Sequence, residues 1–273
     1  SSRQDAPRSF SESISMSADS SADSASPLLA SANTDHAAEY KRLSEAPDWR
    51  YLLRDYYDLY RDMSAGGSPI IRSHQRAVRE AISKVLRADP PVQPLAPMQR
   101  PVTAHLRRAL DNGRRGPMAA VIRAISALRN TLSWQYGYER VPRGLERKYA
   151  YAEFAGPSGP IITDEVIIGV VLFAPGCTYP AHAHKSISES YICLSGAVSE
   201  NHLGVYGPGS MIFNAPGRMH RITVSDWEPA LLAYAWTGPR ESLATQKMVF
   251  SRPGANLEPT ARPKPVKQQP LEP

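Results

Sequence analysis

The chain has 273 residues, a formal net charge of +6 at pH 7 and only two cysteines. Its longest apolar run, at 166–174, is far shorter than the roughly 20 residues of a membrane-spanning helix, and the first thirty residues hold no apolar run of the kind that a secretion signal needs. These features argue against a membrane protein and against a disulfide-stapled secreted domain. We therefore expect a cytoplasmic protein with one compact core.

The two cysteines and the excess of basic residues have simple structural explanations. Cys177 and Cys193 fit neither a disulfide framework nor a four-cysteine zinc site, and we interpret both as reduced core residues. The basic residues gather in places such as RRALDNGRR at 107–115, which is typical of a solvated surface. Because the chain contains no RNA- or DNA-binding motif, we expect no nucleic acid partner. A substrate that carries a carboxylate would also suit the positive charge.

Both ends of the chain are poor in apolar residues. Residues 1–40 form a Ser-rich leader, and residues 251–273 form a polar, Pro-rich tail. Neither segment offers enough apolar surface to offset the entropy lost on ordering. We therefore predict that the leader and the tail are disordered and lie outside the core.

Apolar residues between the leader and residue 147 recur at spacings of three and four, which is the period of an amphipathic helix. The apolar stripes are most simply explained as core contacts, so we predict a helical annex over 41–147 that packs on the rest of the fold. The pattern predicts four helices, over 47–63, 68–86, 102–111 and 118–132.

From Lys148 the chain changes to short segments rich in Val, Ile, Tyr and Phe, separated by Gly and Pro turns. This pattern is typical of a small β-barrel or jelly roll, in which closure of the strands into facing sheets removes exposed edges. The predicted fold class is therefore mainly β, with a barrel over 148–250 that follows the helical annex. We predict strands over 148–154, 165–174, 190–195, 197–201, 210–214, 219–225 and 229–237.

Three histidines and one glutamate of the barrel region have the spacing of metal ligands. His182 and His184 lie two residues apart, so on a strand both imidazoles point to the same face. Glu189 can join them from the following turn, and His220 follows a Pro-Gly turn about thirty residues later. Three imidazoles and one carboxylate suit a single divalent transition metal ion, and Zn, Fe, Mn, Ni and Co all fit this donor set.

The run HAH, then Glu189, then PGRMH resembles the two sequence motifs of the cupins. Over roughly the last 110 residues before the tail, the segments YPAHAHKSISESYICLSGAVSE and LLAYAWTGP resemble the bacterial cupin-type dimethylsulfoniopropionate lyases, most closely the DddL branch. The resemblance implies a cupin jelly roll in which His182, His184, Glu189 and His220 are the metal ligands. Four residues separate His184 from Glu189, where three are commoner in that branch. Members of the family often pair, so we expect a homodimer.

The resemblance also implies a reaction, the cleavage of dimethylsulfoniopropionate into dimethyl sulfide and acrylate through loss of the proton alpha to the carboxylate. Tyr191 matches the proposed base of the family, and Tyr179 matches a second tyrosine of the pocket. An ordinary phenol is a poor base at neutral pH, so this role requires a neighbouring cation. Tyr206, Tyr234 and Trp236 could offer aromatic faces to the dimethylsulfonium group.

Two other functions are compatible with the same motifs, because one barrel hosts many activities. A metal-dependent oxygenase that acts on a small acid or thiol would require Fe(II) and would consume O₂. A ligand-binding sensor would normally be joined to a DNA-binding helix-turn-helix, and the predicted helices show no short turn of that kind. We assign no chemistry to the remaining histidines and leave the arginines beside His220 unassigned; these are His36, His74, His105, His202, Arg218 and Arg221.

Overall fold

A computed structural model gives the fold of the protein and describes residues 40–138, 140–245 and 249–250. The disorder predicted for the leader over 1–40 and for the tail over 251–273 therefore falls, apart from Tyr40, outside the described residues.

The helices lie where the apolar periodicity predicts them, with shifted ends. Helix α3 begins after Ser68, whose hydroxyl accepts a hydrogen bond from the Ile71 backbone N–H, and ends at Ala88, just before Asp89, which has a left-handed backbone (φ 47°). The short helix α6 was not predicted. The α-helices are α2 (Pro47–Asp62), α3 (Pro69–Ala88), α4 (Leu106–Gly113), α5 (Ala119–Leu128) and α6 (Arg240–Ala244), and the 3₁₀ turns are η1 (Leu43–Glu45), η2 (Pro101–His105), η3 (Arg129–Thr131) and η4 (Leu145–Arg147).

In the described part of the chain, ten strands form two sheets, which confirms the predicted jelly roll. The larger sheet has the order β2-β1-β3-β9-β5-β7, and the smaller has the order β10-β4-β8-β6. Strands β2, β4 and β10 were missed, because two of them have only two residues and β4 contains a proline and a histidine instead of an apolar alternation. The strands are β1 (Tyr149–Gly156), β2 (Ile161–Ile162), β3 (Ile167–Phe173), β4 (Thr178–Ala183), β5 (Ser188–Ser195), β6 (Val198–Glu200), β7 (Met211–Asn214), β8 (His220–Val224), β9 (Ala230–Thr237) and β10 (Val249–Phe250).

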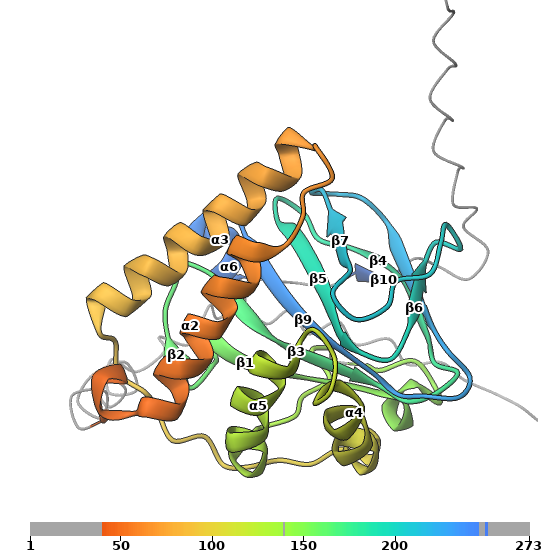
Figure 1. Ribbon diagram of the computed structural model, residues 1–273, viewed down its shortest axis with the longest axis horizontal. Helices are drawn as coiled ribbons and strands as arrows, with labels where there is room; N and C mark the ends of the chain where they lie inside the picture. Colours follow the sequence, from red (N-terminus) through yellow and green to blue (C-terminus); the bar gives the residue numbers. More distant parts are fainter. Residues whose placement is uncertain (1–39, 139, 246–248, 251–273) are drawn as a thin grey trace, which may run out of the picture.

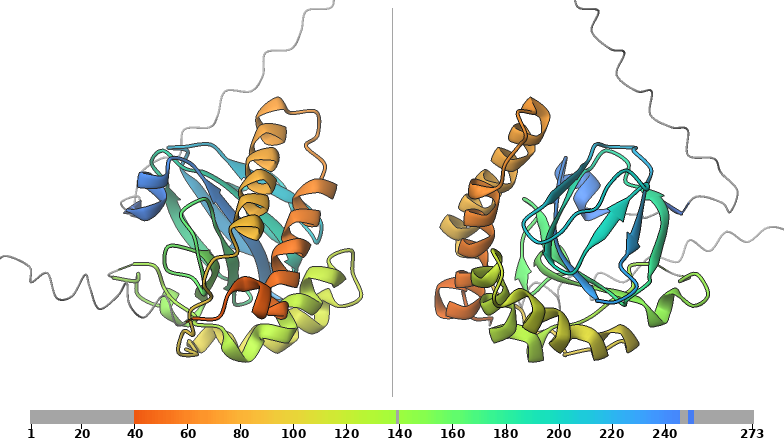
Figure 2. Two further views of the ribbon diagram at one scale, coloured as in Figure 1. Left: turned by 90° about the vertical axis from the view of Figure 1, so that its left-hand side faces the viewer. Right: turned by 45° about the vertical axis from the view of Figure 1, so that its right-hand side comes forward.

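The larger sheet is covered on both faces. Helices α2, α3, α4 and α5 lie against its outer face, and its inner face looks into the barrel (Figures 1 and 2). In β3, Ile168 and Val170 belong to the core beneath the helices, whereas Val171 and Phe173 belong to the core inside the barrel. A strand buried on both faces has no polar positions, which explains the unbroken apolar run of β3. Among the described residues, none of the helices combines the length and the apolar character needed to cross a lipid bilayer.

Strand register decides which side chains meet inside the barrel. On neighbouring strands β5 and β9, Glu189 lies opposite Trp236 and Tyr191 lies opposite Tyr234. In the smaller sheet, His182 of β4 lies opposite His220 of β8. Because side chains alternate along a strand, β5 directs Glu189 and Tyr191 into the barrel and Ser190, which lies between them, toward the helices.

Candidate metal centre

The structure brings the four predicted metal ligands together inside the barrel. His182 lies on β4, His184 directly follows β4, Glu189 lies on β5 and His220 begins β8. One nitrogen or oxygen atom from each side chain lies within 4.8 Å of the corresponding atoms of the other three. All four side chains belong to residues that are at most 3% exposed. The extra residue between His184 and Glu189 is accommodated in a turn in which Ser186 has a left-handed backbone (φ 61°).

The backbone fixes the orientation of two of the imidazoles. His182 Nδ1 lies 2.9 Å from the Pro180 carbonyl oxygen, and His220 Nδ1 lies 3.2 Å from the Arg218 carbonyl oxygen. A carbonyl only accepts hydrogen bonds, so each Nδ1 carries the proton and each Nε2 directs a lone pair toward the other ligands. This arrangement is the usual one for histidines that bind a metal ion, and the donor set therefore fits such an ion.

The Glu189 carboxylate lies at the middle of the cluster. Its Oε2 is 3.1 Å from His184 Nε2, and its Oε1 is 2.9 Å from His220 Nε2. The Trp236 indole N–H donates a hydrogen bond to Oε2 at 2.5 Å. Burial alone would raise the pKa of Glu189, but the two neighbouring imidazoles outweigh burial and hold this pKa well below its ordinary value. Burial, with a smaller contribution from His220, lowers the pKa of His182 to about 3. The cluster therefore combines a carboxylate with an uncharged imidazole at neutral pH.

Both predicted catalytic tyrosines are next to the ligands. The Tyr179 ring lies 4.6 Å from the His182 ring, and the Tyr191 ring lies 6.1 Å from the His220 ring, centroid to centroid. Burial raises the pKa of each phenol well above its ordinary value, and the Glu189 carboxylate adds to this effect at Tyr191. Both hydroxyls therefore hold their protons unless a positive charge is added to the site.

Sequence reasoning missed a third tyrosine of this cluster. Tyr138 belongs to the segment between the helices and the barrel, and its hydroxyl forms a hydrogen bond with the hydroxyl of Tyr179. Tyr149 of β1 packs against both of them, with its ring 4.7 Å from that of Tyr179. The segment around Tyr138 has neither helix nor strand periodicity, so nothing in the sequence predicts that Tyr138 lies beside Tyr179. Only the path of this segment over the barrel brings the two residues together.

The three predicted substrate-binding aromatic residues do not share one place. The Trp236 ring lies 4.7 Å from the His184 ring, and the Tyr234 ring lies 5.5 Å from that of Trp236. Tyr206 instead pairs through its backbone with Val198 at the β6 edge of the smaller sheet. Strand β6 separates Tyr206 from β8 and its predicted metal ligand His220.

A buried polar network lies between strand β5 and the helices, on the outer face of the larger sheet. Ser190 points away from the barrel, and its hydroxyl lies 2.8 Å from His74 Nε2 and 2.6 Å from the Tyr60 hydroxyl. His74 Nδ1 lies 3.0 Å from the Thr237 hydroxyl of β9. Burial lowers the pKa of His74 to about 4. A histidine to which the sequence assigned no chemistry thus joins helix α3 to the two strands that carry Glu189 and Trp236.

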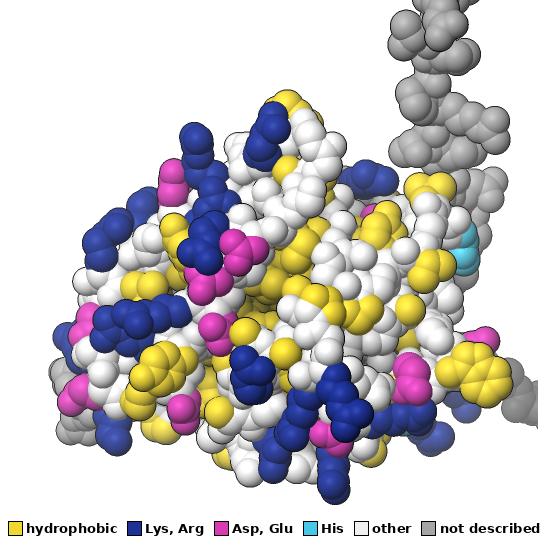
Figure 3. All heavy atoms as spheres, in the orientation of Figure 1, with side chains coloured by type: hydrophobic (Ala, Val, Ile, Leu, Met, Phe, Trp, Pro, Cys, Tyr) yellow, Lys and Arg dark blue, Asp and Glu magenta, His cyan; other side chains and the backbone are white. Residues whose placement is uncertain are grey.

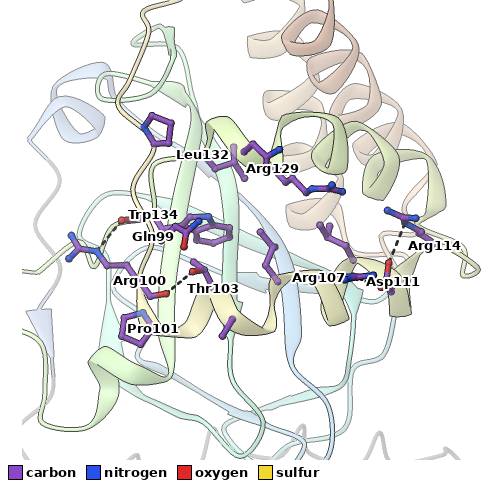
Figure 4. Close-up of a pocket in the computed structure, with 15 residues that line it drawn as sticks. Gln99, Arg100, Pro101, Thr103, Arg107, Asp111, Arg114, Arg129, Leu132 and Trp134 are labelled. Atoms are coloured by element: carbon purple, nitrogen blue, oxygen red, sulfur yellow. Dashed lines mark hydrogen bonds and ion pairs between the residues drawn. The ribbon is translucent and has the colours of Figure 1, made fainter.

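A cavity of about 900 Å³ between helix α4 and the segment around Trp134 is lined by none of the predicted site residues. Arg107 and Arg114 lie beside Asp111 at one end of it, and Arg100 lies next to Trp134 at the other (Figure 4). Lys and Arg side chains gather over the helices on the face shown in Figure 3, with Asp and Glu among them. On this face the basic side chains therefore lie over the helices, among acidic ones.

The two-sheet fold and the buried cluster define a cupin-type jelly-roll protein whose donor set is compatible with a metal ion. The profile of the dimethylsulfoniopropionate lyase family matches residues 74–232. A Cereibacter sphaeroides protein assigned as the dimethylsulfoniopropionate lyase DddL is 51% identical over 215 residues, which cover 79% of this chain and 93% of that protein. The chain belongs to the dimethylsulfoniopropionate lyase family.

Two solved structures have the same fold at low sequence identity. A chain from the crystal structures of the DMSP lyases RdDddP and RnDddQII matches with a TM-score of 0.55 and 21% identity, covering 76% of this chain and 99% of that chain. The DMSP lyase DddQ from Ruegeria pomeroyi DSS-3 matches with a TM-score of 0.51 and 22% identity, covering 66% and 99% of the two chains. At this level of sequence identity, the two structural matches support a shared fold and nothing more specific.

Proposed function

We propose that this protein is a carbon–sulfur lyase that cleaves dimethylsulfoniopropionate into dimethyl sulfide and acrylate. The observation that carries the proposal is the 51% identity, over most of both chains, to a protein assigned as this lyase. The buried cluster of three histidines and one glutamate supports it, because abstraction of a proton beside a carboxylate requires stabilisation of the negative charge that develops.

In this proposal His182, His184, Glu189 and His220 hold one divalent transition metal ion, with Zn, Fe and Mn as the candidates. When bound, such an ion withdraws electron density from the substrate carboxylate and offsets the negative charge of Glu189 beside the tyrosines. Burial of the ligands excludes water, which strengthens these electrostatic effects.

We assign Tyr191 as the base. A cation held by the four ligands would favour Tyr191 as the phenolate. As the phenolate oxygen takes the alpha proton, the electron pair of the C–H bond forms the carbon–carbon double bond, and the C–S bond breaks with its electrons on sulfur. The products are acrylate and neutral dimethyl sulfide, and the proton then passes from Tyr191 to solvent. Tyr179, which is hydrogen-bonded to Tyr138, assists from the opposite sheet. Trp236 and Tyr234 offer aromatic faces to the cationic sulfur.

Headspace gas chromatography for dimethyl sulfide tests the proposal. The purified chain is loaded in turn with Zn, Fe or Mn and mixed with dimethylsulfoniopropionate. The variants Tyr191→Phe and His220→Ala are assayed in the same way. The control is Tyr51→Phe, a change on the exposed side of α2. We expect release by the wild type and the control and a loss in both site variants. No dimethyl sulfide with any of these metals would reject the lyase, and oxygen uptake with Fe(II) would then favour the oxygenase.

A homodimer is also part of the proposal, and it rests on the family resemblance. Size-exclusion chromatography with light scattering measures the mass directly. A mass near twice the 30.0 kDa of the chain is expected, and a mass near 30.0 kDa would contradict the dimer.

A further inference from the structure

A second, smaller cavity lies beside the metal centre and shares one wall with it. Its volume is about 150 Å³, on the order of five water molecules. Trp236 is the shared wall, because its indole donates to Glu189 while the same residue lines the cavity. None of the four metal ligands lines this cavity, so its chemistry does not depend on a metal ion. The other walls used below are Tyr151, Glu153 and Tyr234.

A glycine of β3 allows this cavity to have an aromatic wall. Gly169 lies opposite Tyr234 of β9 on one side and opposite Glu153 of β1 on the other. A Cβ at this position would lie 2.5 Å from the Tyr234 hydroxyl and 2.7 Å from the carbon that bears it. The missing side chain thus leaves space for the Tyr234 ring, which meets the Tyr151 ring edge to face at 6.3 Å. Two tyrosine rings and one indole therefore border the same small space.

A single carboxylate borders the same space. Glu153 Oε1 accepts a hydrogen bond from the Ser158 backbone N–H at 3.0 Å, which fixes the side chain. Within the described part of the chain, no Lys, Arg or His forms an ion pair with Glu153. Burial raises the pKa of Glu153 to about 7, as expected for a carboxylate without a compensating cation. The Tyr234 hydroxyl is also buried and has no hydrogen-bond partner among these residues.

We propose that this cavity is a binding site for a methylated onium group, either a sulfonium or a quaternary ammonium. An onium group has no N–H or O–H to donate, so it is recognised by ring faces and by a nearby negative charge, and these are the groups that the cavity offers. A metal ion would instead require several converging donor atoms, and a neutral ligand would leave the carboxylate uncompensated. The site shares Trp236 and Tyr234 with the aromatic faces assigned above to the cationic sulfur, and to that extent it rests on the proposed function. Tyr151 and Glu153 extend it beyond that assignment.

Trimethylsulfonium is the direct probe, because it has the cationic head and no carboxylate to bind a metal ion. Isothermal titration calorimetry of the wild type with trimethylsulfonium chloride should give saturable binding, and the neutral tert-butanol should give none. Glu153→Gln keeps an oxygen for the Ser158 N–H and removes the charge, and it should weaken binding about tenfold. Glu80→Gln removes the same charge from the exposed surface of α3 and should leave binding unchanged. Circular dichroism melting verifies that both variants are folded.

Two results would overturn the site. One is the absence of saturable binding by the wild type, and the other is equal affinity of Glu153→Gln and Glu80→Gln while both remain folded. A second variant, Tyr151→Leu, removes a ring without a charge and should also weaken binding of trimethylsulfonium; unchanged affinity would contradict the aromatic wall.

Competition kinetics distinguishes the two sources of an onium ligand. If trimethylsulfonium raises the KM for dimethylsulfoniopropionate and leaves kcat unchanged, the cavity takes the sulfonium end of the substrate. If binding occurs without competition, the cavity takes a separate onium compound, and the site still stands. A chain that releases no dimethyl sulfide but binds trimethylsulfonium through Glu153 would reject the lyase and leave this inference intact.

Discussion

The Trp236 indole donates a 2.5 Å hydrogen bond to the Glu189 carboxylate, across the register pair that joins β9 to β5. The same ring packs 4.7 Å from the His184 ring, so one side chain fixes two of the four proposed ligands. Groups in this position orient ligands without touching the metal ion, and their loss commonly lowers metal affinity by 10- to 100-fold. Removal of the Trp236 indole N–H should therefore lower the affinity of the site for a metal ion.

We expect Trp236→Phe to lower metal affinity by about tenfold or more, because phenylalanine keeps the aromatic packing and removes the N–H. Competition with a chromophoric chelator measures the affinity. Trp227→Phe, a change at a residue that is 82% exposed, is the matched control and should leave the affinity unchanged. Equal metal affinity of the two variants would show that the hydrogen bond does not support the ligand.

Removal of the metal ion should both stop the reaction and destabilise the fold. A ligand that binds only the folded state stabilises it by about 2.7 kcal/mol at a concentration one hundred times its Kd. We expect chelation followed by desalting to abolish dimethyl sulfide release and to lower the Tm, with both restored when the metal is added back. His220→Ala lacks a proposed ligand, so its Tm should respond weakly to the metal, and a wild-type response in this variant would exclude His220 as a ligand.

Tyr138→Phe tests whether the segment over the barrel takes part in the reaction. The change removes the hydrogen bond to Tyr179, and a neutral hydrogen bond contributes about 0.5–1.5 kcal/mol, so kcat should fall by roughly 2- to 10-fold. Tyr191→Phe removes the proposed base and should cost about 100-fold or more. Steady-state rates of dimethyl sulfide release, with Tyr51→Phe as control, compare the two. If kcat fell further in Tyr138→Phe than in Tyr191→Phe, the result would contradict the assignment of Tyr191 as the base.

His74 predicts a stability change at mildly acid pH. Its pKa is about 4 in the folded chain and near 6.5 when unfolded, so the unfolded chain binds more protons between these values. The stabilisation from the neutral imidazole is therefore complete above pH 6.5 and declines as the pH falls toward 4. Between pH 7 and pH 5 the wild type should lose about 2 kcal/mol relative to His74→Gln, which does not titrate.

Urea unfolding at both pH values measures this difference, and the proposed metal ligands titrate equally in both chains. If the wild type and His74→Gln differ in free energy of unfolding by the same amount at both pH values, His74 is not buried in its neutral form.

Local patterns of the sequence predicted most of the architecture. The stripe through Leu52, Leu53 and Tyr56 predicted helix α2, since burial of one helix face requires apolar residues at spacings of three and four. Strand β4 was missed although it carries the proposed site residues Tyr179 and His182. Residues that form a site interrupt the alternation of apolar and polar residues from which a strand is predicted.

The four proposed ligands were also predictable, because His182 and His184 are close in sequence and Glu189 and His220 occur in motifs with short-range spacing. The contacts of Tyr138 and His74 were not. Tyr138 reaches Tyr179 across 41 positions of the chain, and His74 reaches Ser190 across 116. No local periodicity encodes such pairs.

The sequence by itself therefore determined the class of fold and the family and predicted the ligand set, because each depends on the chemistry of residues that are near one another along the chain. The tertiary structure alone decided the hydrogen bond from Trp236 to Glu189, the support of β5 by helix α3 and the close approach of the Tyr234 ring to Gly169. These features depend on strand register and on the packing of helices against a sheet, and both are set by the simultaneous burial of distant segments.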